Sequence, residues 1–133
     1  MMNALCHCPW CSKGLGMCPV HLRLMTDGNY KITGEEHIKV FKGNGKLRFG
    51  KCTKCGCSVY QGPEGANFKA FYPRMFDGYI SGSTGKSNKL PADLQHKIHV
   101  NYENRLWDWN DGKPKFAAFP PNDPMNDDGS AKE

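Results

Sequence analysis

Apolar and polar residues alternate in short stretches along this chain of 133 residues, and most stretches end at glycine, asparagine or proline. Alternation with a period of two is typical of strands that bury one face. The pattern predicts strands at residues 17–25, 30–33, 38–41, 47–49, 58–60, 67–72 and 98–102. A short helical turn is expected at 90–94. The chain is therefore predicted to be mainly β, with little helix.

Composition divides the chain into one domain and a tail. Fifteen glycines and nine prolines favour a loop-rich, metal-stapled β fold over a helical bundle. Residues 81–88 are rich in glycine and serine, which predicts a flexible loop. Residues 120–133 are polar and rich in proline and acids, which predicts a disordered tail. We expect residues 1–119 to form a single domain.

Six of the seven cysteines lie in two tight groups. The first cluster is Cys6, Cys8 and Cys11, and the second cluster is Cys52, Cys55 and Cys57. Cys-x-x-Cys spacing lets two thiolates reach one Zn²⁺ in its tetrahedral geometry. The start of the chain lacks the features of a secretory signal, so we expect a cytoplasmic protein whose thiols bind metal rather than form disulfides.

The residues leave the zinc ligand set open. The first cluster can hold a zinc with an open fourth position, or it can close a structural site with a fourth ligand from Cys18, the second cluster or a histidine. Cys18 and Cys57 are expected to be small core side chains. His7 is expected to point away from Cys6 and Cys8, because side chains alternate in extended backbone. His99 is expected to be half-buried in a strand, or else to carry protons in a pocket.

The net charge and the distribution of basic residues indicate which kinds of binding partner to expect. The formal net charge is +5 and the isoelectric point is near 8.8, with the basic residues densest between Lys31 and Lys54. This region could attract an anion, but its aromatic residues are not interleaved with clustered Lys and Arg as in nucleic-acid binders, so nucleic acid is not expected as a partner. No apolar run approaches the ~18 residues that span a bilayer, so no membrane is expected either.

The two cysteine clusters, with the residues around them, resemble the zinc family that includes glutathione-dependent formaldehyde-activating enzyme (GFA) and centromere protein V. The family's Cys-His-Cys-x-x-Cys motif is matched by residues 6–11, followed by Ser12-Lys13-Gly14. Its aromatic strand leading to Cys-x-x-Cys-Gly is similar to residues 49–60. Leu90-Pro91, His99 and Trp107 or Trp109 resemble its C-terminal part.

The resemblance implies an antiparallel, zinc-pinned β-sandwich of the Mss4-like kind. It implies that Cys52 and Cys55 are structural zinc ligands, and that Cys6, Cys8 and Cys11 hold a second zinc with an open position. The implied activity is that of a carbon-sulfur lyase acting on glutathione and formaldehyde, or on a related thiol adduct. The partner would be a small thiol such as glutathione.

The chain departs from the family at its start. The family normally begins with a Gly-x-Cys-x-Cys-Gly strand whose thiols complete the structural site, and residues 1–5 contain no cysteine. Either the sequence lacks the family's first strands, or a shortened variant completes the site with other thiols or imidazoles. A zinc-stapled interaction module without catalysis is therefore the alternative hypothesis, and whether one zinc or two bind stays open.

Overall fold

The computed structural model describes residues 2–43, 45–76 and 90–133, so the loop predicted at 81–88 lies outside the described residues. The described chain divides into two compact units. The central unit is Arg23–Gln95, and the terminal unit combines Met2–Leu22 with His96–Glu133. Strand β2, Val20–Thr26, begins in the terminal unit and ends in the central unit.

The central unit is an antiparallel sheet with the strand order β3-β4-β5-β6-β2. Its other strands are β3 (Ile38–Lys42), β4 (Leu47–Cys52), β5 (Ser58–Pro63) and β6 (Phe68–Phe71). Short 3₁₀ helices, η1 (Glu35–His37) and η2 (Pro73–Met75), lie beside them in the chain. Phe49, Ala70 and Phe71 are buried and form the core of this unit.

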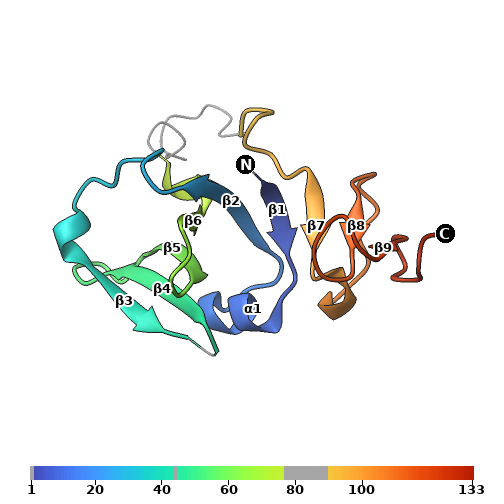
Figure 1. The fold of residues 1–133 in the computed structure, drawn as a ribbon, viewed down its shortest axis with the longest axis horizontal. Coiled ribbons are helices and arrows are strands. Elements are labelled where there is room, and N and C mark those ends of the chain that lie inside the picture. Colours follow the sequence, from blue (N-terminus) through green and yellow to red (C-terminus); the bar gives the residue numbers. More distant parts are fainter. Residues whose placement is uncertain (1, 44, 77–89) are drawn as a thin grey trace. The chain divides into compact units, whose positions relative to one another are not determined.

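The terminal unit has the strand order β2-β1-β7-β8-β9 (Figure 1). Its elements are β1 (Asn3–Cys6), α1 (Pro9–Leu15), β7 (Ile98–Val100), η3 (Tyr102–Asn104), β8 (Lys115–Phe116) and β9 (Pro124–Met125). Strand β7 pairs in parallel with both β1 and β8, and β9 is antiparallel to β8. Ala4, Val100 and Tyr102 are almost completely buried in its core.

The prediction of a mainly β chain with little helix is confirmed, since the described residues contain nine strands and one α-helix. The parallel pairs β1–β7 and β7–β8 differ from the wholly antiparallel arrangement that the family resemblance implied. The strand predicted at 30–33 is wrong, because these residues have no strand partner and lead into a turn. Strand β1 and helix α1 were not predicted. No helix among the described residues is long and apolar enough to cross a membrane.

The C-terminal segment, predicted to be a disordered tail, carries strand β9 and defined hydrogen bonds. The Tyr102 hydroxyl donates to the carbonyl oxygen of Asp127 at 2.6 Å, and Lys115 Nζ lies 2.8 Å from an Asp127 carboxylate oxygen. Tyr102 and Lys115 are buried, so their polar atoms need partners inside the protein. One of these partners is the carboxylate of Asp127, an acidic residue of the kind that suggested disorder.

Candidate metal centre

The first cluster lies where strand β1 ends and helix α1 begins. Cys6 is the last residue of β1, Cys8 precedes the helix, and Cys11 faces inward from its first turn. Pro9 suits the start of the helix, because the first turn has no use for its missing N–H. Gly16 ends the helix at φ 73°, a conformation that glycine adopts without strain, and its N–H bonds the Ser12 carbonyl at 2.7 Å.

The three sulfur atoms of the first cluster converge. Together they form a group whose ligand atoms all lie within 4.8 Å of one another. Cys6 Sγ and Cys11 Sγ are 3.7 Å apart, far longer than a disulfide bond of about 2.05 Å. Two sulfurs bound tetrahedrally to one zinc at 2.3 Å would be about 3.8 Å apart. The cluster therefore fits a zinc ion without a large rearrangement.

Burial and one side-chain hydrogen bond define the surroundings of the first cluster. Cys6 and Cys11 are buried and Cys8 is half-buried. The Asn101 side-chain N–H donates to Cys6 Sγ at 3.4 Å, an outer-shell contact of the kind that tunes metal ligands. No fourth Cys, His, Asp or Glu among the described residues joins the three sulfurs. Among the described residues, these three thiols could therefore hold a metal ion.

Without a metal, two thiols of the first cluster, Cys6 and Cys8, are held protonated by raised pKa values. The hydrogen bond with Cys11, together with burial, raises the pKa of Cys6 to about 11. The hydrogen bond with Cys6, together with burial, raises the pKa of Cys8 well above its usual range. Since a metal binds the thiolate form, uptake of an ion here must displace protons.

The second cluster occupies the turn between β4 and β5. Gly56, at φ 76°, completes the turn, and its N–H bonds the Cys52 carbonyl at 2.8 Å. Cys55 and Cys57 are exposed, and Cys52 is half-buried. The expectation that Cys57 is a core side chain is therefore wrong, since the tight turn directs it to solvent. Cys18, expected in the core, is also half-buried.

The second cluster differs from the first in geometry. Among the described residues, Cys52, Cys55 and Cys57 do not form a group of three converging ligands. The assignment of Cys52 and Cys55 as zinc ligands therefore stays a prediction. Each cluster lies within its own unit, the second in the central unit and the first in the terminal unit.

A hydrogen-bonded network of three imidazoles and one carboxylate lies beside the first cluster in the terminal unit. His7 Nε2 is 2.9 Å from His99 Nδ1, and His99 Nε2 is 2.7 Å from Asp111 Oδ2. His96 Nε2 approaches the same Asp111 oxygen at 2.7 Å. His96, His99 and Asp111, the histidine–aspartate group, form the second set of three potential ligands within 4.8 Å of one another. This set lacks any sulfur.

Burial and mutual contact shift the pKa values of His7, His99 and Asp111. Burial, together with the neighbouring His99, lowers the pKa of His7 to about 4. Burial also lowers the pKa of His99, against the hydrogen bond to Asp111. Although burial alone would raise the pKa of Asp111, hydrogen bonds from His96 and His99 hold it well below its usual range. The neutral imidazole of His99 therefore faces an ionised Asp111 carboxylate.

Sequence reasoning found part of this arrangement. His7 lies away from the converging thiols, as expected, but His99 is fully buried rather than half-buried. Asp111 was missed because Asn-Asp-Gly indicates only a turn. The sequence signal that could have indicated Asp111 was the pair His96 and His99, three residues apart, followed by a carboxylate before the next strand.

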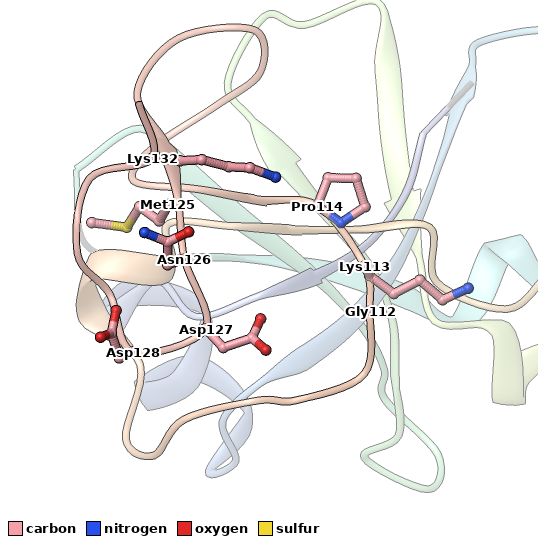
Figure 2. A pocket seen from close by; sticks show the side chains of 8 residues that line it. All are labelled: Gly112, Lys113, Pro114, Met125, Asn126, Asp127, Asp128 and Lys132. Carbon is pink, nitrogen blue, oxygen red and sulfur yellow. The ribbon is translucent and has the colours of Figure 1, made fainter.

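A hollow of about 530 Å³ opens elsewhere in the terminal unit (Figure 2). Its charged lining residues are Lys113, Asp127, Asp128 and Lys132. Neither the converging thiols nor the histidine–aspartate group lines it. The hollow is therefore not the candidate metal centre.

Comparison with known protein families, curated proteins and solved structures finds no match to this chain.

Proposed function

We propose that Cys6, Cys8 and Cys11 hold a Zn²⁺ ion whose open position accepts a small thiol such as glutathione. The observation that carries the proposal is the convergence of three sulfurs, with no fourth protein ligand among the described residues. Zinc with an open position acts as a Lewis acid and lowers the pKa of a thiol that it binds. The seven free cysteines suit a reducing cytoplasm.

The residues around the thiols define how a substrate would approach. Cys6 and Cys11 are buried, whereas Cys8 is half-buried, so an incoming thiol approaches on the Cys8 side. Asn101 donates to Cys6 and stabilises its thiolate form. Lys13, in the last turn of α1, adds positive charge to the same unit and favours an anionic thiol such as glutathione.

The proposed reaction is the reversible addition of glutathione to formaldehyde, which makes the protein a carbon-sulfur lyase of the GFA type. Sulfur forms a bond to the carbonyl carbon, the C=O π bond breaks, and the oxygen takes up the proton that the thiol has lost. No oxidant or reductant is needed. The product is S-hydroxymethylglutathione.

The test compares the rate of S-hydroxymethylglutathione formation with and without zinc-loaded protein. Exchange between ¹³C-formaldehyde and its glutathione adduct, followed by NMR, measures this rate against the spontaneous reaction. Acceleration is expected for the unaltered protein and for Cys57→Ser, the matched control in an exposed turn, and should be absent in Cys8→Ser. Zinc-loaded protein that neither binds glutathione nor accelerates exchange would contradict the proposal.

A second candidate function is a zinc-stapled interaction module without catalysis. It is favoured by two large apolar side chains near the first cluster, since Trp10 is 50% exposed and Met17 is 58% exposed. Exposed aromatic and methionine side chains are common in binding surfaces. For such a module, zinc removal should unfold the terminal unit while zinc-loaded protein leaves the thiol reaction at its spontaneous rate.

A further inference from the structure

The histidine–aspartate group aims three ligand atoms at one point. His96 precedes β7, His99 lies within it, and Asp111 lies in the turn before β8. Both imidazoles approach the same carboxylate oxygen at 2.7 Å through their Nε2 atoms. Two imidazoles and one carboxylate are a ligand set used by zinc and by other divalent transition metals.

Each of the two more buried ligands is oriented by a contact at its opposite atom. His99 is fully buried, and its Nδ1 lies 2.9 Å from His7 Nε2. Asp111 Oδ1 accepts from Lys115 Nζ and from the Lys113 backbone N–H, each at 3.1 Å. Metal-binding histidines and carboxylates are commonly fixed in this way through the atom that does not bind the ion.

Charge at the group suits a cation. The positive charge of Lys115 is shared between two carboxylates, because Asp127 lies 2.8 Å from its Nζ and Asp111 lies 3.1 Å away. One negative charge therefore remains among these three residues, which favours a bound cation.

The contact between His7 and His99 can serve two proton arrangements. Without metal, His99 donates from Nε2 to Asp111 and accepts at Nδ1 from His7. With metal at Nε2, His99 carries its proton at Nδ1 and donates it to His7 Nε2 across the same 2.9 Å contact. His7 Nδ1 is buried with no hydrogen-bond partner among the described residues, so it can hold the proton that His7 then carries.

Metal binding requires a modest movement. Two ligand atoms at about 2.05 Å from one tetrahedral ion are about 3.3 Å apart, so each imidazole nitrogen must move away from the Asp111 oxygen by about 0.6 Å. His96, with a side chain 24% exposed and outside any strand, has room to do so. Its partial exposure, like that of Asp111, also gives an ion a route from solvent.

We infer that His96, His99 and Asp111 form a second divalent-metal site, independent of the thiolate site and open to a small oxygen or nitrogen ligand. The inference goes beyond the proposed function, because it assigns the chain a sulfur-free centre that the thiol reaction does not use. His7 connects the two sites, since its chain neighbours are the thiol ligands Cys6 and Cys8 and its ring contacts His99.

Cobalt titration of the full chain, prepared without oxygen, distinguishes the two sites. Co²⁺ at the thiolate site gives intense sulfur-to-cobalt charge-transfer absorption, whereas Co²⁺ on imidazole and carboxylate gives only weak visible bands. We expect two equivalents of bound Co²⁺, one of each kind. Asp111→Asn and His96→Ala should each weaken the sulfur-free site by more than the roughly 10- to 100-fold that loss of an outer-shell partner costs, while charge-transfer absorption persists.

Two further variants keep the test decisive. Cys8→Ser should lose the charge-transfer absorption and keep one weakly absorbing equivalent, which tests the sulfur-free site without altering its ligands. His37→Ala, a histidine of the central unit outside the group, should keep both equivalents. The inference is overturned if the unaltered chain and Cys8→Ser both bind no sulfur-free equivalent. It is also overturned if that equivalent survives both Asp111→Asn and His96→Ala unchanged.

Discussion

The two cysteine clusters have nearly the same spacing in the sequence but different environments in the structure. The first joins the end of a buried strand to a helix, and its three sulfurs converge within 4.8 Å. The second sits on a turn between two strands, with Cys55 and Cys57 exposed. Three cysteines within six residues therefore converge only where the elements on both sides direct the thiols inward.

The largest effect expected from this difference is the local loss of structure when the metal is removed. Structural zinc contributes on the order of 10 kcal/mol of apparent binding free energy, and in our proposal the first cluster holds it. Chelation should therefore reduce hydrogen-exchange protection in β1 and α1 far more than in β3 and β4, which amide exchange read by mass spectrometry measures. Equal loss in both units, or no loss in either, would show that the clusters do not differ in this way.

The next largest effect is on alkylation of the metal-free chain, in which the cysteines of the two clusters should react at different rates. Raising the pKa of Cys6 to about 11 lowers its thiolate fraction at neutral pH by at least about 100-fold, and burial slows access further. Cys55 and Cys57 are exposed, so iodoacetamide should label them at least about 100-fold faster than Cys6, as followed by peptide mass spectrometry. Comparable rates for all three would contradict the buried, protonated state of Cys6.

Zinc affinity of the first cluster should rise with pH. The raised pKa values of Cys6 and Cys8 mean that both thiols are protonated between pH 6 and 8, so binding displaces at least these two protons. Apparent affinity should then increase by at least about 100-fold per pH unit, tenfold for each proton. Calorimetry in buffers of different ionisation enthalpy counts the protons released. A pH-independent affinity would mean that the thiols are already ionised without metal.

The smallest effect concerns Asn101, whose amide donates to Cys6 Sγ. Asn101→Gly removes the donor but tolerates the φ of 52° at this position. Zinc affinity should fall roughly tenfold, within the range expected for an outer-shell partner. Competition with a chromophoric chelator measures the change. Asn104→Gly, at the end of η3, is the control and should leave the affinity unaltered.

The sequence predicted the β character of the chain where alternation is regular, as in β3 and β4. It did not predict β1, because Asn-Ala-Leu-Cys is buried throughout and shows no alternation. It did not predict α1 either, because a helix of seven residues containing glycine has little intrinsic propensity and depends on packing around Cys11.

The candidate site was predictable to the extent that its residues are close in sequence. Cys6, Cys8 and Cys11 lie within six residues, so their spacing alone indicates a metal. The contact between His7 and His99 joins positions 92 residues apart, and nothing in either local sequence indicates it. Asp111 acquires its partners only through the placement of β7 and β8.

Because β1 pairs with β7, the two candidate sites are completed at different times during synthesis. The thiol ligands leave the ribosome together, and a metal could gather them before the rest of the terminal unit exists. The histidine–aspartate group and β7, one of the two strands that flank β1, are made only after the central unit, so closing this large loop comes late and carries an entropic cost. Early metal capture would protect the nascent thiols from oxidation before β7 pairs with β1.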